Sequence, residues 1–157
     1  MMNYNIRIID SSSINSQNNT GGGGTVTTSA VLMFDGGARP PDNGEAAIGF
    51  TLQIEGEPRM EFAERIGRAT CNEAEYQSLI GGLSTALDVG VDDITVRGDS
   101  QLVVMQLRGE WKTREPRLRV LRDEANELLE QFDAFEIEHV PRAQNSISDS
   151  LVESAFG

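Results

Sequence analysis

The stretch Val31-Leu32-Met33-Phe34-Asp35-Gly36-Gly37 contains a strongly marked strand with a carboxylate at its end. Four consecutive apolar residues bounded by glycines predict a buried strand. Asp35 falls in phase with Val31 and Met33 on the two-residue period of a strand. A carboxylate at the end of a buried strand is costly unless it is paired or binds a cation, although a turn-forming aspartate before Gly-Gly is the commoner case. Partners for Asp35 are therefore sought among acids at similar junctions, which are Glu75, Asp99 and Asp149.

The sequence that follows predicts an antiparallel meander and then a helix. Turn residues separate the first strand from a second over 46–54, and a short loop leads to a third over 59–66. A helix is expected over 70–89, because Thr70 and Glu73 have capping-box spacing and a glycine follows.

The second half of the chain alternates strands with helices. Strands are expected over 94–97 and 135–140, and helices begin at Ser100, at Pro116 and shortly before Asp149. A meander followed by strands that are reached through helical crossovers makes one sheet of mixed direction. We therefore predict an α/β fold with a five-stranded mixed sheet flanked by helices.

The chain divides into a tail and one domain. Residues 11–29 consist almost entirely of Ser, Asn, Thr and Gly, and such a composition buries too little apolar surface to offset the entropy of ordering. We expect residues 1–29 to be a flexible N-terminal tail, although Asn3 to Ile9 is compatible with a short strand. Residues 30–157 are expected to form the catalytic domain.

Composition limits the class of protein. The sequence has neither a membrane-spanning apolar run nor a secretory signal, and its single cysteine excludes an internal disulfide, so we expect a cytoplasmic monomer with no membrane partner. The net charge is −12, with one lysine among the basic residues. Strong acidity usually argues against a nucleic-acid partner, because phosphate binding depends on Lys and Arg. It also marks proteins adapted to high salt, and the sequence leaves both explanations open.

Helix geometry separates two neighbouring glutamates. Residues two apart on a helix differ by about 200° of rotation, so Glu73 and Glu75 cannot both face the sheet. Glu75 shares the apolar stripe of Leu79 and Leu83, whereas Glu73 has the spacing of a capping residue. Glu75 is therefore the functional candidate and Glu73 is structural.

The remaining acids are predicted to meet at one edge of the sheet. If the helix over 70–89 is a right-handed crossover, the strands that end in Asp35 and Asp99 are parallel, and α/β sheets bind ligands at such carboxyl ends. Asp149 alone is weaker evidence, because an aspartate early in a helix is favourable with the dipole. Four converging carboxylates repel one another unless a cation neutralises them, and their hard oxygens suit Mg²⁺ or Mn²⁺. Two such ions about 3.5–4 Å apart serve phosphoryl chemistry.

These residues lie in motifs that resemble the type 1 ribonuclease H family. The motifs cover the chain from Val31 to the C-terminus and occur in the family's order: Phe34-Asp35-Gly36-Gly37, Ala47-Ile48-Gly49, Thr70-Cys71-Asn72-Glu73-Ala74-Glu75-Tyr76, Gly98-Asp99-Ser100-Gln101, and Val140-Pro141-Arg142 through Asn145 to Asp149-Ser150-Leu151. The resemblance implies a ribonuclease H-like fold and Mg²⁺-dependent cleavage of the RNA strand of an RNA/DNA hybrid. It places Asp35, Glu75, Asp99 and Asp149 in the metal-binding catalytic set.

The chain also departs from the family's pattern. Cys71 stands where an asparagine is frequent, which leaves Asn72 and Gln101 as the expected contacts to base edges and sugars. The basic helical protrusion of some bacterial members is replaced by the short loop over 110–115, as in compact archaeal-like members. This replacement argues against tight, processive binding.

Two aromatic residues and the class of activity remain open. His139 lies ten residues before Asp149, where some members carry a histidine that aids proton transfer or product release, but a histidine that ends a strand is more often a plain surface residue. Trp111 either stacks on nucleic acid or packs under its loop, and packing is the default. The alternatives to a ribonuclease H are a related module that binds without cutting, which the complete set of acids disfavours, and a resolvase or transposase-like nuclease, which Asp99-Ser100-Gln101 and the short chain disfavour.

Overall fold

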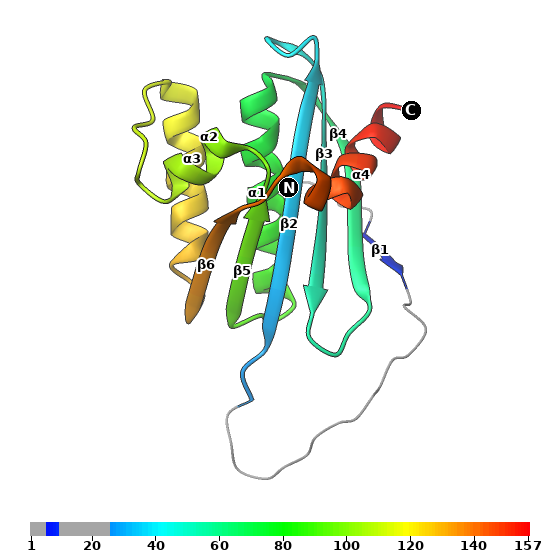
Figure 1. Cartoon of the computed structure of the whole chain (residues 1–157), viewed down its shortest axis with the longest axis vertical. Coiled ribbons are helices and arrows are strands. Elements are labelled where there is room, and N and C mark those ends of the chain that lie inside the picture. The colour runs from blue at the N-terminus through cyan, green and yellow to red at the C-terminus, as the bar shows by residue number, and fades with distance from the viewer. Residues whose placement is uncertain (1–5, 10–25) are drawn as a thin grey trace.

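A six-stranded sheet forms the centre of the computed structural model, which describes residues 6–9 and 26–157. The sheet order is β1-β4-β3-β2-β5-β6 (Figure 1). Its strands are β1 (Ile6–Ile9), β2 (Ser29–Arg39), β3 (Gly44–Ile54), β4 (Arg59–Ala69), β5 (Asp93–Gly98) and β6 (Ala134–His139). The helices are α1 (Cys71–Asp88), α2 (Gln101–Leu107), α3 (Pro116–Leu129) and α4 (Ser146–Phe156), and the 3₁₀ turn η1 (Arg142–Asn145) precedes α4.

The predicted α/β fold is confirmed. β2, β3 and β4 form the antiparallel meander, and β5 pairs in parallel with both β2 and β6. The parallel pairing of β2 with β5 follows from α1, which crosses from β4 to β5 as expected.

The structure adds one strand to the five that the sequence predicts. β1 pairs antiparallel with β4, with Ile6 opposite Phe62 and Ile9 opposite Arg59. This strand lies within Asn3 to Ile9, which the sequence left compatible with a short strand, and it satisfies backbone groups along an edge of β4 that would otherwise be open. Residues 1–5 and 10–25 lie outside the described residues, and the division into tail and domain stays a prediction there.

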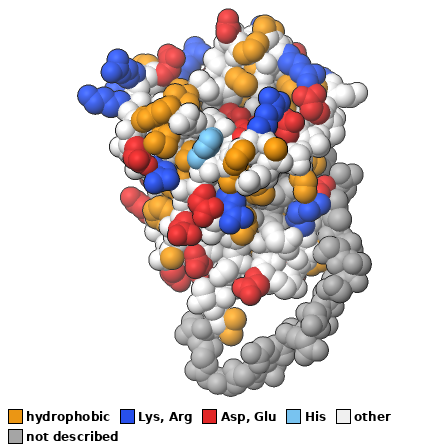
Figure 2. Space-filling model, viewed as in Figure 1, with side chains coloured by type: hydrophobic (Ala, Val, Ile, Leu, Met, Phe, Trp, Pro, Cys, Tyr) orange, Lys and Arg blue, Asp and Glu red, His pale blue; other side chains and the backbone are white. Residues whose placement is uncertain are grey.

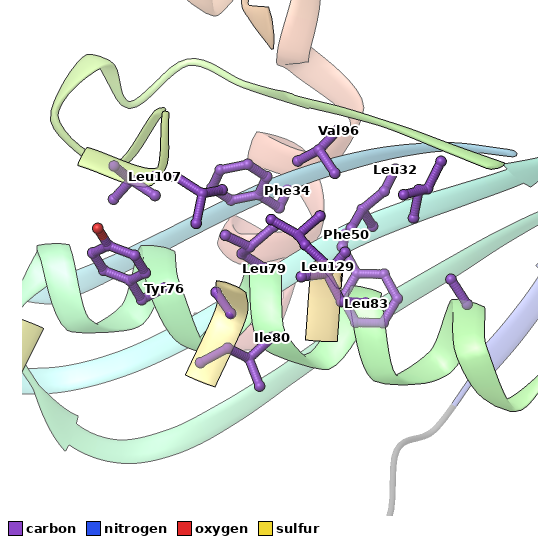
Figure 3. Close-up of a cluster of buried hydrophobic side chains, with 14 of the residues drawn as sticks. Leu32, Phe34, Phe50, Tyr76, Leu79, Ile80, Leu83, Val96, Leu107 and Leu129 are labelled. Atoms are coloured by element: carbon purple, nitrogen blue, oxygen red, sulfur yellow. The ribbon is translucent and has the colours of Figure 1, made fainter. Parts of the chain in front are cut away.

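The core lies between the sheet and the helices of one face. α1 packs on β2 and β3 and contacts α3, whereas α4 packs on the opposite face against β2, β3 and β4. Figure 3 shows Leu32, Phe34 and Phe50 of the sheet facing Leu79 and Leu83 of α1. None of the described helices is both long and apolar enough to cross a membrane.

Two glycines allow helices of both faces to approach the sheet closely. A Cβ built at Gly36 would lie 2.4 Å from the backbone carbon of Ala74, and one built at Gly49 would lie 2.7 Å from the carbonyl oxygen of Ser148. Any side chain at these positions would push α1 or α4 away from the sheet. The two glycines therefore set the distances across the edge where the predicted acids lie.

Candidate active site

Three of the four predicted acids meet at the carboxyl ends of β2 and β5. Asp35 on β2 and Glu75 on α1 are each 7% exposed, and Asp99 follows β5 in a half-buried position. One carboxylate oxygen of each lies within 4.8 Å of those of the others. Asp149 on α4 lines the same cavity of about 220 Å³ but is not part of this group among the described residues.

The first turn of α1 explains why Glu75 faces inward. Thr70 caps the helix through its hydroxyl, which accepts from Glu73 N at 3.1 Å, and the Glu73 carboxylate accepts from Thr70 N at 2.9 Å. The capping box predicted from the spacing is therefore confirmed. It fixes the rotation of the helix, so that Glu75 is buried beside Asp35 and Glu73 is not.

The pKa values of all three carboxylates are raised. Burial raises the pKa of Asp35 to about 7, a hydrogen bond with Glu75 opposes this shift, and the charges of Asp99 and Asp149 add to it. Burial raises the pKa of Glu75 well above its ordinary value, and the charge of Asp35 raises it further. Burial also raises the pKa of Asp99, while a hydrogen bond from Asn145 opposes the shift. Burial and mutual repulsion therefore outweigh the stabilisation that Asn145 and the charge of Arg142 give to Asp99.

The donor set fits a hard divalent cation. Glu75 Oε2 is buried and has no hydrogen-bond partner among the described residues, which is costly unless a proton or a metal ion lies beside it. Three carboxylates from three different elements offer only oxygen ligands, the type that Mg²⁺ and Mn²⁺ prefer. A cation at this position would neutralise the charges whose repulsion raises the pKa values.

Two polar residues near Asp149, to which the sequence assigned no role, complete the site. Asn145 is 1% exposed, and its Nδ2 donates to Phe34 O at 2.8 Å and to Asp99 Oδ2 at 3.4 Å. Ser148 Oγ donates to Met33 O at 3.1 Å. Both residues therefore attach the start of α4 to β2, and Asn145 also orients the Asp99 carboxylate. Asn145 and Ser148 are three residues apart and in phase with the buried Val152, and this helical spacing is the sequence signal that would have predicted their burial against the sheet.

Comparison with known proteins places this geometry in a family. A family model described as "Reverse transcriptase-like" matches residues 33–155. The crystal structure of RNase H1 from the halophilic archaeon Halobacterium salinarum superposes with a TM-score of 0.77 at 47% identity, covering 82% of this chain and 97% of that chain. The chain belongs to the ribonuclease H1 family.

Further members of the ribonuclease H1 family give the extent of the similarity. A curated "Ribonuclease HI" of Halobacterium salinarum is 49% identical over 122 residues, which are 76% of this chain and 61% of that protein. The N-terminal RNase H domain of a bifunctional Mycobacterium tuberculosis protein superposes with a TM-score of 0.78 at 38% identity, covering 82% of this chain and 94% of that chain. LC11-RNase H1, solved in complex with an RNA/DNA hybrid, superposes with a TM-score of 0.73 at 32% identity, covering 80% of this chain and 95% of that chain. The chain thus spans 61% of the halobacterial protein and 34% of the whole mycobacterial one.

Within this ribonuclease H fold, the outer residues of the site are exposed. Asn72 lines a cavity of about 410 Å³ that meets the acid-lined cavity at Cys71, and Gln101 is the exposed first residue of α2. Their assignment to substrate binding stays a prediction. His139 is also exposed, and its Nε2 lies 3.2 Å from Asp99 O, so both interpretations of this residue stay open.

Asp149 pairs with a basic residue whose charge also acts on Asp99. Arg142 Nη2 lies 3.4 Å from Asp149 Oδ1, and the pKa of Arg142 is raised chiefly by that carboxylate. The guanidinium is exposed, so this ion pair contributes little stability and leaves Arg142 accessible from solvent.

The raised pKa of Asp35 predicts that Asp35→Asn stabilises the metal-free protein at neutral and higher pH. Below about pH 4 the carboxyl is protonated in the folded and unfolded states, and its contribution to stability is fully present. As the pH rises through about 7, this contribution is lost, because the unfolded chain ionises more readily than the folded site. In EDTA at about pH 8, Asp35→Asn should unfold at a higher temperature than the wild type, with a free energy of unfolding larger by at least about 1 kcal/mol. At about pH 4 the two proteins should unfold alike.

The matched control is Asp42→Asn, which removes the same charge from an exposed position. Asp42→Asn should shift the thermal unfolding temperature little at either pH. An equal gain in both variants at high pH would assign the effect to net charge and not to the site.

Proposed function

We propose that this chain is an endonuclease that hydrolyses the RNA strand of RNA/DNA hybrids, with divalent metal ions held by Asp35, Glu75, Asp99 and Asp149. The observation that carries the proposal is the convergence of three carboxylates within 4.8 Å, one of them with a buried oxygen that has no partner among the described residues. Similarity to a curated ribonuclease HI and to LC11-RNase H1, whose structure contains a hybrid, supports the substrate class. All four acids come from one chain, and we propose that it acts as a monomer.

The residues of the site have different roles according to how deeply they are buried. Mg²⁺, or Mn²⁺ in its place, would supply activation of a water molecule and stabilisation of the leaving oxygen. Asp35 and Glu75 form the buried floor, where a low effective dielectric strengthens their attraction for a cation. Asn145 holds Asp99 in orientation, and Asp149 lies at the rim beside Arg142. The Arg142 guanidinium is placed to pair with a substrate phosphate in exchange for Asp149.

Asn72 and Gln101 are proposed to recognise the minor groove of the hybrid around the cut site. A-form-like duplexes present 2′-hydroxyls there, and an amide both donates to and accepts from such a group. The double substitution Asn72→Ala and Gln101→Ala should raise KM for the hybrid by about 10-fold or more without unfolding the domain, since each lost contact is worth about 1 kcal/mol. Steady-state kinetics measure the effect.

The matched control replaces the same two residue types near the C-terminal end of α3, with Asn126→Ala inside the helix and Gln131→Ala just after it. These substitutions should leave KM unchanged. Hybrid kinetics in the Asn72 and Gln101 double variant that equal those of the wild type would reject the assigned role.

A panel of labelled duplexes tests the proposed function. RNA/DNA hybrid, RNA duplex and DNA duplex of one sequence are each incubated with Mg²⁺ and with EDTA, and the products are separated on a gel. Fragments should appear only from the RNA strand of the hybrid and only with Mg²⁺. Binding of the hybrid without fragments would instead support a ribonuclease H-like module that does not cut, and cleavage of the DNA duplex would support a different nuclease class.

A further inference from the structure

A buried polar cluster joins the helix that carries Glu75 to the loop after α2. Tyr76, the next residue along α1, is fully buried, and its hydroxyl donates to Gln106 Oε1 at 2.7 Å. Gln106 Nε2 in turn donates to Lys112 O at 3.5 Å. Burial raises the pKa of Tyr76 to about 12, against the opposing effects of Arg122 and of the Thr113 hydroxyl, so the phenol remains a donor at neutral pH. Thr113 is itself buried, which brings a second loop residue into the cluster.

The second half of this loop depends on the cluster for its position. Backbone bonds hold the first half, since Glu110 N and Trp111 N both donate to Met105 O, at 3.0 and 3.1 Å. Outside the regular elements, no backbone–backbone hydrogen bond within the described part of the chain involves residues 112–114. The Gln106 amide and the burial of Thr113 therefore hold this segment in place.

The loop has the chemistry of a nucleic-acid contact. Trp111 is 41% exposed, contrary to the expectation that it packs under the loop, and Lys112 and Arg114 are exposed beside it. Residues 108–122 contain six basic and two acidic residues, a net charge of about +4 in a chain of −12. Basic side chains gather at this upper end of the molecule, near the turn between α2 and α3 (Figure 2). A cationic surface with an exposed aromatic ring suits phosphates and bases.

Two neighbouring cavities that share Cys71 lie between the acids and this loop. The cavity of about 410 Å³ is lined by Thr70 and Asn72 of the α1 start and by Glu115 and Arg117, where the loop runs into α3. It shares Cys71 with the cavity that holds the acids. A duplex seated over the acids would therefore extend along these cavities to the loop.

We propose that Tyr76, Gln106 and Thr113 are positioning residues that hold the loop 108–115 as a fixed basic wall of the substrate groove, where it contacts the phosphates of the bound hybrid. The inference rests on the proposed function for its substrate. Fixing the loop in advance reduces the conformational entropy lost on binding, so the cluster acts on affinity and not on the chemical step. Tyr76 is adjacent to Glu75 in sequence, yet its hydroxyl points to the loop and not to the acids.

The test separates binding from catalysis in the full chain. Tyr76→Phe keeps the ring and removes only the hydroxyl, and Gln106→Met keeps the length of the side chain and removes the amide that bonds the Tyr76 hydroxyl and Lys112 O. Each should raise KM for the hybrid by about 5-fold to 20-fold and leave kcat within about twofold, because the missing contact affects ground and transition states equally. Thr85→Val is the matched control: it also removes a buried hydroxyl from α1, one that bonds Gly81 O away from the loop, and it should change neither constant.

A double-mutant cycle tests whether the cluster acts through the loop. Lys112→Ala with Arg114→Ala should raise KM similarly and reduce the slope of log affinity against log salt by about 2. Adding Tyr76→Phe to this variant should produce little further change, since the loop contacts are already lost. The positioning role would be overturned if the increases in KM from Tyr76→Phe and from the loop variant multiplied fully. It would also be overturned if Tyr76→Phe lowered kcat at unchanged KM.

Binding measured in EDTA keeps this proposal distinct from the proposed function. Fluorescence anisotropy with a labelled hybrid reports affinity without cleavage, and Gln106→Met replaces Tyr76→Phe if the latter does not fold. If the wild type binds the hybrid but never cuts it, the proposed function fails, and weaker binding by the variants still supports the positioning role. If the wild type does not bind the hybrid, or if both variants bind as tightly as the wild type, the positioning role is wrong.

Discussion

Asp35→Asn and Asp99→Asn should each reduce cleavage of the RNA strand by about 1000-fold or more while the domain stays folded. Each removes one charge from the three carboxylates that lie within 4.8 Å of one another. A metal-binding charge at the reacting centre is worth several kcal/mol, and about 4 kcal/mol corresponds to about 1000-fold in rate. Single-turnover cleavage of a labelled hybrid measures the loss, and isothermal titration with Mg²⁺ should show the matching loss of binding.

Asp149→Asn should have a smaller effect, on the order of 10-fold. Its carboxylate lies outside the group of three and already pairs with Arg142. Asp133→Asn serves as the exposed control, because Asp133 follows α3 and lines neither of the two cavities, and it should cleave at the wild-type rate. Wild-type cleavage by Asp35→Asn in folded protein would remove that residue from the catalytic set.

The second large effect concerns salt. We propose that the net charge of −12 reflects adaptation to high salt, a proposal that the similarity to a protein of a halophilic archaeon supports. At low ionic strength the acidic surface repels itself and the substrate phosphates, and at about 1 M salt the Debye length falls to about 3 Å. Between about 0.1 and 2 M KCl, the unfolding temperature should rise by about 5–10 °C.

The cleavage rate at saturating hybrid should hold or rise over the same range. A nuclease that relies on six to ten phosphate contacts loses about 10³-fold to 10⁵-fold in affinity between 50 and 200 mM salt, and saturating hybrid keeps such a loss in KM out of the measured rate. Calorimetry and initial rates at fixed Mg²⁺ measure both effects, with sorbitol of equal osmolarity as a control that does not screen charge. A steep fall in rate while the fold is retained would require another explanation for the acidity.

Local signals in the sequence were sufficient for most of the fold and for three members of the acid group. The spacing of Thr70 and Glu73 specifies a capping box by itself, and that box sets which face of α1 carries Glu75. Asp35 and Asp99 were predictable because each ends an apolar strand, and the right-handed crossover makes those strands parallel. Such features depend on residues within a few positions of one another.

The features that the sequence did not predict depend on distant partners. The hydrogen bond from Asn145 to Phe34 O joins residues 111 positions apart, and no local pattern contains it. The sequence allowed a short strand at Asn3 to Ile9 but not its partner, because the unpaired edge of β4 is a property of the assembled sheet. The hydrogen bond from Tyr76 of α1 to Gln106 of α2 joins residues 30 positions apart and likewise has no local signal.

A titration of Mg²⁺ from EDTA upward, with cleavage of the RNA strand as the readout, tests the central claim most directly when it compares Glu75→Gln with Glu73→Gln. The two glutamates lie two residues apart on one helix, and each substitution removes one charge from α1. The wild type and Glu73→Gln should respond to Mg²⁺ alike, with Glu73→Gln losing only about 1 kcal/mol or less of stability. Glu75→Gln should show no appreciable cleavage at any Mg²⁺ concentration. Cleavage by the wild type in EDTA, or full activity in Glu75→Gln with none in folded Glu73→Gln, would contradict a metal site built from Asp35, Glu75 and Asp99.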